Sequence, residues 1–136
     1  MCRGLRLLAL LFMAAAAPGC GGNAAALTAP TLPTATDTYS GTMTHNGGFD
    51  YPFASTQAGT VTASYTSIGT DNSIALGLAL GTWNGSTCSV LLVNDNATVG
   101  VVVSGAVSGA ASLCVRVFDV GFVSDPLSYQ VQVVHP

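Results

Sequence analysis

Short apolar alternations separated by turn-forming residues constrain this chain more than any other feature of its sequence. From Thr38 onward, apolar and polar residues alternate in short runs, and Gly, Asn, Asp and Pro interrupt these runs. A period of two puts the side chains of a strand on opposite faces of a sheet, and the interrupting residues favour tight turns. We therefore predict strands over 38–44, 48–54, 58–67, 73–82, 86–93, 98–107, 111–120 and 127–134.

The last predicted strand indicates the kind of sheet. One of its faces is apolar and the other polar, with Leu127, Tyr129, Val131 and Val133 opposite Ser128, Gln130 and Gln132. This pattern is typical of an antiparallel sheet with one side in water. Eight such strands need two sheets packed face to face, because a single sheet of that size would leave its apolar face wet. The sequence therefore predicts an all-β, two-sheet antiparallel β-sandwich over 38–136.

The strand predicted over 73–82 has one large and one small face. Ile74, Leu76, Leu78 and Leu80 alternate with Ala75, Gly77, Ala79 and Gly81. Two interpretations stay open: a central strand whose small face is closely covered by another part of the chain, or a flat surface on which another molecule docks.

The amino terminus has the layout of a secretory signal followed by a cysteine. Arg3 and Arg6 form a positively charged start, residues 7–17 are apolar, and small residues precede Cys20. The apolar run is too short for a stable membrane span and is typical of an export signal. Residues 17–20, Ala-Pro-Gly-Cys, resemble the lipobox of bacterial lipoproteins, whose cysteine is acylated and becomes the new amino terminus. We predict a signal peptide over 1–19, and a lipidated Cys20 with a flexible linker over 20–37.

An alternative for this segment is ordinary signal-peptidase cleavage, for example after Ala26, which would discard Cys20 and release a secreted chain. Under the lipobox interpretation, Gly21 in the second mature position implies sorting to the outer membrane. Pro30 and Pro33 favour an extended spacer before the domain. The chain is therefore predicted to be exported, either anchored in the bacterial envelope or secreted.

The charge balance excludes whole classes of partner. After removal of the signal, Arg116 is the one basic residue left against six aspartates, and the chain has neither Lys nor Glu. Such a chain has no basic patch for a nucleic-acid backbone or for anionic lipid headgroups. We therefore expect no nucleic-acid partner, and membrane attachment only through acyl chains on Cys20, each buried methylene contributing about 0.8 kcal/mol.

Two cysteines lie inside the predicted domain, Cys88 and Cys114, on separate predicted strands. In an exported protein such a pair most often forms a disulfide. Closing a loop of about 27 residues would stabilise the fold by about 3.5 kcal/mol on the chain-entropy model.

Six short segments follow one another in an order that resembles the bacterial pre-peptidase C-terminal domain. They are Gly41-Thr42-Met43-Thr44, Phe49-Asp50-Tyr51-Pro52-Phe53, Ala58-Gly59-Thr60-Val61-Thr62-Ala63-Ser64, Ser73-Ile74-Ala75-Leu76-Gly77-Leu78, Leu113-Cys114-Val115-Arg116-Val117 and Ser128-Tyr129-Gln130-Val131-Gln132-Val133. The family is a jelly-roll β-sandwich that is usually appended to secreted proteases and is not itself an enzyme. The resemblance implies a jelly-roll-like fold and an extracellular setting, and it transfers no catalytic residue. The cysteine pair is not a hallmark of that family, and no peptidase is attached here.

No familiar catalytic motif occurs in the sequence, so we predict that the protein is not an enzyme. His45 and His135 are expected to be exposed turn and tail residues. Calcium is the one cofactor for which oxygen ligands are available, at Asp71, Asn72, Asn94, Asp95 and Asp119. Turn formation alone also accounts for these residues.

Trp83 and Asn84 form the remaining candidate site, at the end of a predicted strand. A rim tryptophan could stack on a sugar or anchor a protein partner, or else cap the core half-buried. The sequence as a whole predicts a non-enzymatic, envelope-anchored lipoprotein whose β-sandwich is a binding or structural module with an unknown protein or glycan partner. The alternatives are a carbohydrate-recognition module and a secreted, non-lipidated accessory domain.

Overall fold

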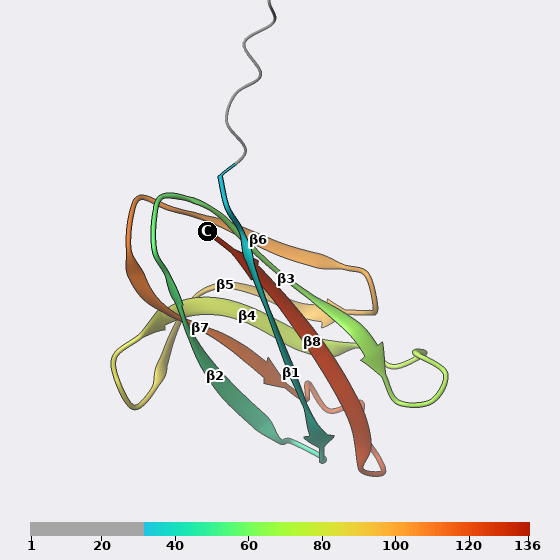
Figure 1. The fold of residues 1–136 in the computed structure, drawn as a ribbon. Coiled ribbons are helices and arrows are strands. Elements are labelled where there is room, and N and C mark those ends of the chain that lie inside the picture. Colours follow the sequence, from blue (N-terminus) through green and yellow to red (C-terminus); the bar gives the residue numbers. More distant parts are fainter. Residues whose placement is uncertain (1–31) are drawn as a thin grey trace, which may run out of the picture. The chain divides into compact units, whose positions relative to one another are not determined.

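A computed structural model describes residues 32–136, and the predicted signal peptide and Cys20 lie outside the described residues. The described part contains eight strands and no helix (Figure 1), so no helix there is long and apolar enough to cross a membrane. The strands are β1 (Ala35–Met43), β2 (Gly48–Ser55), β3 (Gly59–Ile68), β4 (Leu76–Trp83), β5 (Cys88–Ala97), β6 (Val102–Val107), β7 (Ala111–Phe118) and β8 (Leu127–His135).

The eight strands form two antiparallel four-stranded sheets. Sheet A has the order β1-β8-β3-β6, and sheet B has the order β2-β7-β4-β5. Consecutive strands alternate between the sheets except for β4 and β5, which pair with each other in sheet B, and this order is that of a jelly roll made of two Greek keys. The predicted all-β sandwich with jelly-roll-like topology is therefore confirmed.

The core lies between the inner faces of the two sheets, where the alternating apolar residues meet. In β8, Tyr129, Val131 and Val133 are almost completely buried while Ser128 and Gln130 are exposed, as the period of two predicts.

The two faces of β4 have different neighbours. Leu76, Leu78 and Leu80 point into the core, and Gly77 and Gly81 are buried on the opposite face. A Cβ atom at Gly77 would collide with the ring of Phe118, and one at Gly81 would collide with the backbone of Ser89. The small face of β4 is thus closely covered by the chain itself, as the first of the two interpretations predicts.

Tyrosines join the two sheets on the side of the sandwich where β1 and β2 are the edge strands. Tyr39 of β1 stacks on Tyr51 of β2 with ring centroids 4.6 Å apart, and the Tyr51 and Tyr129 hydroxyls are 2.6 Å apart. Tyr65 of β3 donates a hydrogen bond of 2.7 Å to the carbonyl oxygen of Gly77 in β4. All four tyrosines of the chain therefore take part in contacts between the sheets.

Several strand ends differ from the prediction: β4 starts at Leu76 rather than 73, β6 starts at Val102 rather than 98, and β5 ends at Ala97 rather than 93. β1 starts at Ala35 rather than 38, because it pairs along its whole length with β8, and Ala35 lies opposite His135. The run Asn94-Asp95-Asn96, which we predicted to be a turn, belongs to β5. It takes up an extra residue there, since the pairing shifts between Leu76↔Ala97 and Leu78↔Asn94. The side-chain oxygen of Asn94 stabilises this bulge, because it accepts a hydrogen bond of 2.9 Å from the Asn96 backbone N–H.

His135 corrects another expectation, because it is buried rather than an exposed tail residue. Its side chain is 7% exposed, its Nε2 lies 3.0 Å from the Asp37 carboxylate, and its ring packs 5.1 Å from that of Phe53. The residue closes the pairing of β8 with the start of β1.

Candidate functional site

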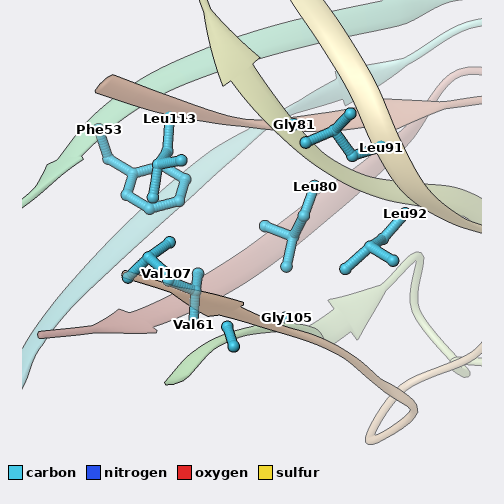
Figure 2. A pocket seen from close by; sticks show the side chains of 10 residues that line it. Phe53, Val61, Leu80, Gly81, Leu91, Leu92, Gly105, Val107 and Leu113 are labelled. Atoms are coloured by element: carbon cyan, nitrogen blue, oxygen red, sulfur yellow. The ribbon is translucent and has the colours of Figure 1, made fainter. Parts of the chain in front are cut away.

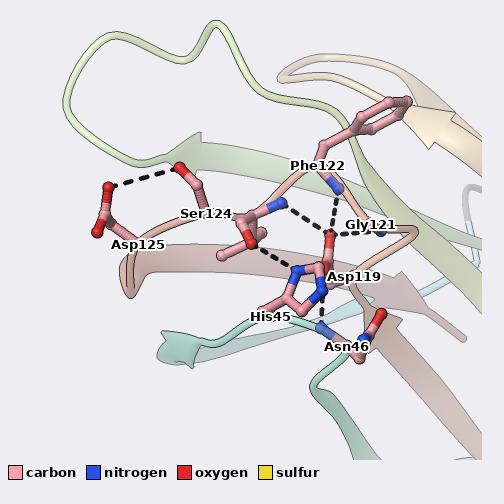
Figure 3. Close-up of polar contacts among 8 residues, drawn as sticks. His45, Asn46, Asp119, Gly121, Phe122, Ser124 and Asp125 are labelled. Atoms are coloured by element: carbon pink, nitrogen blue, oxygen red, sulfur yellow. Dashed lines mark hydrogen bonds and ion pairs between the residues drawn. The ribbon is translucent and has the colours of Figure 1, made fainter.

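The loop between β7 and β8 is built around one buried carboxylate (Figure 3). Asp119 is 8% exposed, and its Oδ1 accepts backbone N–H bonds from Gly121 and Phe122 at 2.9 Å and from Val123 at 3.1 Å. Its Oδ2 accepts the Asn46 N–H at 2.8 Å, from the turn between β1 and β2. One side chain therefore holds the backbone of two loops that are far apart in the sequence.

The sequence around this carboxylate favours such a loop. An aspartate readily accepts amides from the residues that follow it, and Gly121, with φ of +102°, supplies the left-handed backbone that turns these amides toward it. In the other loop, Asn46 adopts φ of +56°. The two loops are also joined by the Asp119 N–H, which donates to the Gly47 carbonyl oxygen at 2.9 Å.

His45 adds a further link on the outside of this cluster. Its Nδ1 lies 2.9 Å from the Val123 carbonyl oxygen and 3.6 Å from Oδ2 of Asp119, and its side chain is 60% exposed. The prediction that His45 is an exposed residue beside a turn is confirmed. Its ring also contributes to the contacts between the β1–β2 turn and the β7–β8 loop.

The surroundings of Asp119 lower its pKa. Burial alone would raise the pKa, but the backbone N–H donors of Asn46, Val123, Gly121 and Phe122 outweigh it because they stabilise the ionised form. The carboxylate is therefore held in its charged form at neutral pH, and four backbone N–H groups donate to it.

Phe122 is the side chain that this loop presents to solvent. It is 60% exposed and points away from the Asp119 cluster in Figure 3, whereas the next residue, Val123, is 1% exposed and belongs to the core. The loop is thus anchored on one side and displays a large aromatic ring on the other.

A polar recess lies beside this loop, between it and the loop that joins β3 to β4. It has a volume of about 440 Å³ and is open to solvent. Asp71 and Asp125 lie on its two walls, with hydroxyl groups of Thr70, Ser73 and Ser124 near them. The recess therefore presents negative charge next to the loop that carries Phe122.

An apolar cleft opens at the opposite side of the sandwich from the tyrosine contacts, between the edge strands β5 and β6 (Figure 2). Its volume is about 60 Å³, and its lining consists of apolar side chains and glycine: Phe53, Val61, Leu80, Gly81, Leu91, Leu92, Gly105, Ala106, Val107 and Leu113. A Cβ atom at Gly105 would lie 2.7 Å from a methyl group of Leu92, so the glycine lets Leu92 approach β6. A space of this size holds about two water molecules and is far smaller than a typical small-molecule site.

The predicted disulfide is present. Cys88 of β5 and Cys114 of β7 are bonded across the outer face of sheet B, spanning β4. It fixes the first residue of edge strand β5 to the middle of the sheet.

Trp83 and Asn84 are placed at the β4–β5 turn. Trp83 is half-buried and lies opposite Cys88 in the pairing of β4 with β5. The Asn84 carboxamide is used within the turn, where its oxygen accepts the Ser86 and Thr87 amides at 3.0 and 2.9 Å. The asparagine thus has a structural role in the turn, and the sugar-stacking role of the tryptophan stays a prediction.

The five proposed calcium ligands are not brought together into one centre. Asp71 accepts from Ser73 within its own turn, and the Asn72 side chain accepts the Ile68 amide at 2.9 Å. Asn94 and Asp95 lie on β5, and Asp119 is occupied as described above. Within residues 32–136, no group of three or more His, Cys, Asp or Glu side chains is arranged to hold a metal ion.

Phe122 was not among the residues singled out from the sequence. In the run Val120-Gly121-Phe122-Val123 it resembles one more core residue, and only the Asp119 bonds show that the chain turns there and exposes it. An aspartate followed two residues later by glycine, directly after a strand, is the signal that would have indicated such a loop.

Comparisons with known proteins bear on the fold. No family model matches the chain, and no curated protein matches it. Two solved structures share its fold at 14% sequence identity. One is PliG of Aeromonas hydrophila, a periplasmic lysozyme inhibitor of g-type lysozyme, with a TM-score of 0.51 over 72% of this chain and 83% of that one. The other is the Yersinia pseudotuberculosis-derived mitogen, with a TM-score of 0.53 over 76% of this chain and 88% of that one. The chain is thus similar in fold to small β-sandwich proteins that are named for an inhibitory and a mitogenic action.

Proposed function

We propose that this protein is an exported, non-enzymatic binding module, tethered to the envelope through Cys20, and that a protein partner docks on the β7–β8 loop around Phe122. The observation that carries the proposal is an exposed aromatic side chain on a loop whose backbone is fixed by the Asp119 carboxylate. Large exposed aromatic rings are favoured anchors of protein interfaces.

The fixed backbone matters because binding costs free energy wherever it orders a loop. Each side chain or loop segment that must be immobilised on binding reduces affinity, so a loop that is already ordered by its own bonds binds more tightly. Asp119 and Asn46 provide this order before any partner arrives. Phe122 needs little further ordering to serve as an anchor.

Charge indicates the chemistry of the partner. Residues 32–136 contain six aspartates and one arginine, and that arginine, Arg116, is already paired with Asp50 at 3.1 Å. Asp71 and Asp125 line the recess beside the Phe122 loop. A partner with a basic surface and an apolar pocket would match both features, since complementary charge speeds and orients association.

The position of the loop suits a tethered module. The chain enters the sandwich at Leu32, which lies near Gly59 at the start of β3, whereas the β7–β8 loop meets the turn at the end of β1. Because the strands alternate in direction, these two places are at opposite ends of the sandwich (Figure 1). The docking loop is therefore not at the end of the sandwich where the chain enters.

The neighbours in fold also support the proposal, because they are an inhibitor and a mitogen, proteins named for an effect rather than for a reaction. The resemblance of 38–135 to pre-peptidase C-terminal domains stays a prediction.

Site-specific photo-crosslinking in the exporting cell tests the docking loop. A photoreactive phenylalanine analogue replaces Phe122 in the full chain, and the same analogue at Phe49 of β2, which is 41% exposed, is the matched control. We expect a discrete protein adduct from position 122 and none from position 49. Adding Asp119→Asn to the position 122 chain should weaken the adduct, because the loop is then no longer held.

Two results would contradict the proposal. One is the absence of a protein adduct from position 122. The other is retention of a polysaccharide on a glycan screen that is abolished by Trp83→Ala and untouched by Phe122→Ala, which would favour the carbohydrate-recognition alternative.

A further inference from the structure

The turn between β4 and β5 contains an asparagine followed by a glycine, Asn84-Gly85, and both residues are exposed. In such a pair the backbone nitrogen of the glycine can attack the side-chain carbonyl carbon of the asparagine. The attack closes a five-membered ring, and glycine has no Cβ atom to obstruct the approach. Asparagine is for this reason one of the chemically labile residues of proteins. The turn therefore contains both reactants of a self-modification.

Hydrogen-bond donors are aimed at the oxygen on which negative charge develops during this attack. Oδ1 of Asn84 accepts the Ser86 N–H at 3.0 Å and the Thr87 N–H at 2.9 Å. It also accepts the Ser86 hydroxyl at 3.1 Å. Donors that are already in place where charge appears lower the barrier of a reaction, as they do around the oxyanion of an acyl transfer. The turn is thus arranged to stabilise the tetrahedral intermediate.

A hydroxyl group lies beside the nitrogen that must leave. Nδ2 of Asn84 donates to Oγ1 of Thr87 at 2.8 Å. As the bond between the side-chain carbon and Nδ2 breaks, this nitrogen gains a lone pair and needs a proton. The Thr87 hydroxyl is within hydrogen-bond reach to deliver that proton. The carboxamide oxygen faces donors and its nitrogen faces an oxygen, so the group has the orientation that the reaction requires.

The nitrogen of Gly85 is free to react. Its N–H donates to no other atom of residues 32–136. A Cβ atom at Gly85 would have no atom within 4 Å apart from its neighbours in the chain, and the residue has φ of +101°. Attack by this nitrogen therefore breaks no hydrogen bond within the described structure, and its proton can pass to solvent.

The other asparagine–glycine pair of the chain, Asn46-Gly47, is held differently. The Gly47 N–H donates to the Thr44 carbonyl oxygen at 2.8 Å, and the Asn46 N–H donates to the Asp119 carboxylate. The Gly47 nitrogen must therefore give up a hydrogen bond before it can attack. The fold protects this pair and leaves the pair in the β4–β5 turn ready to react.

We propose that Asn84 is a site of spontaneous deamidation, at which the β4–β5 turn converts its own asparagine to aspartate and isoaspartate. The Gly85 nitrogen loses its proton to solvent and bonds to the side-chain carbonyl carbon of Asn84. The bond from that carbon to Nδ2 breaks, and ammonia leaves with a proton from Oγ1 of Thr87, which regains one from solvent. Water then opens the succinimide ring at either carbonyl group, which gives the two products. Water is the one co-reactant.

The products change the turn in two ways. A carboxylate replaces a neutral carboxamide next to Trp83 in the sequence. In isoaspartate the main chain also runs through the former side chain of Asn84, which lengthens the turn by a methylene group. The surface around Trp83 would thus exist in an unmodified form and in a form with one more negative charge.

Peptide mapping of the purified exported chain during incubation at mildly alkaline pH tests the site. Deamidation replaces NH2 by OH and changes the peptide mass, and enzymatic methylation detects isoaspartate. We expect deamidation at Asn84 to be about tenfold faster than at Asn46, which is the effect of one hydrogen bond on a rate. In urea, with the disulfide reduced, the two sites should react at similar rates, because the fold then no longer distinguishes them.

Two variants of Thr87 test the role of its hydroxyl group. Thr87→Val removes the hydroxyl and should slow deamidation at Asn84 severalfold. Thr87→Ser keeps the hydroxyl and should react as the natural chain does. Thr87 is exposed, so both variants should melt close to the natural chain and leave the rate at Asn46 unchanged.

Three outcomes would overturn the proposal. They are equal rates at Asn84 and Asn46 in the folded chain, a rate at Asn84 that is higher in urea than in the folded chain, and equal rates for Thr87→Val and Thr87→Ser. The second would show that the turn protects its asparagine. None of them decides the docking of a partner on the Phe122 loop, which has its own crosslinking readout.

Discussion

Two aspartates show at the residue scale how surroundings decide what a carboxylate does. The Asp71 side chain is exposed, and the hydrogen bonds from Ser73 lower its pKa within a single turn. Asp119 is buried, and its bonds join loops whose residues are 73 positions apart in the sequence. Both carboxylates are stabilised in their charged form, but only Asp119 ties distant parts of the chain together. The loop that carries Phe122 therefore depends on the ionisation of one residue.

Asp119→Asn should lower the free energy of unfolding by about 2 kcal/mol at neutral pH, since hydrogen bonds to a charged acceptor are the stronger ones and the new NH2 group faces backbone donors. The folded pKa of Asp119 lies below the usual value of 3.8. Its contribution is therefore complete above that value and is lost as the pH falls through the lower, folded pKa. Urea unfolding of the natural chain and the variant across this acid range measures both effects.

Asp125→Asn is the control for this experiment. Asp125 is exposed, and its carboxylate has one weak contact, 3.4 Å from the Ser124 hydroxyl. Its replacement should change stability little at any pH. A stability difference for Asp119→Asn that stays constant down to strongly acid pH would contradict the role assigned to its charge.

At the scale of elements, the small face of β4 is closely covered by its two neighbouring strands, β7 and β5. Its leucines fill the core while its glycines allow Phe118 from β7 and the backbone of β5 to lie directly on the strand. Gly81 lies between the two disulfide-bonded strands, opposite Cys114 on β7 and Val90 on β5. The small face thus lets the outer side of sheet B be covered without a third layer.

The two glycines of β4 should respond differently to an added methyl group. At Gly81 the new Cβ atom meets the carbonyl group of Ser89, which is backbone in a paired strand and has no room to yield. At Gly77 it meets the ring of Phe118, a side chain that can rotate. We expect Gly81→Ala to destabilise the fold by about 3 kcal/mol and Gly77→Ala by about 1 kcal/mol. Thermal unfolding of both variants measures this difference. A larger loss of stability for Gly77→Ala than for Gly81→Ala would contradict it.

Elements of this fold differ in how far the sequence predicts them. All eight strands were predicted, because alternation and turn residues are local signals that each strand carries itself. The early start of β1 and the burial of His135 were not, because both arise from pairing between opposite ends of the chain. The exposure of β5 also escaped prediction, since Val90 to Val93 are as apolar as a core strand, and only the sheet order shows that they lie at an edge.

The candidate site was less predictable than the fold for the same reason. Cys88 and Cys114 could be paired because they are the two cysteines of the domain. Asp119 was noticed as an oxygen ligand, but its four backbone donors come from two loops that meet only in the folded chain. The exposure of Phe122 depends on the loop conformation that these hydrogen bonds hold, so it could not be predicted from the sequence.

At the scale of the whole sandwich, the entry of the chain and the β7–β8 loop lie far apart. Leu32 lies near the start of β3, and the β7–β8 loop lies at the other end of the sandwich (Figure 1). Residues 32–136 carry a net charge of −5 and no basic patch for a lipid surface, so membrane attachment through Cys20 stays a prediction that needs its own test.

Attachment through acyl chains on Cys20 and attachment through charge respond in opposite ways to salt. In about 1 M salt the screening length falls to about 3 Å, so a chain held by charge leaves the membrane, while burial of acyl chains is not weakened. We expect the natural chain to stay with the membrane fraction in high salt, to leave it in detergent, and to incorporate a fatty-acid analogue during growth. Cys20→Ser should abolish the label and move the chain to the soluble fraction. A natural chain that takes up no label and is found in the medium would show instead that cleavage occurs beyond Cys20 and that the protein is secreted.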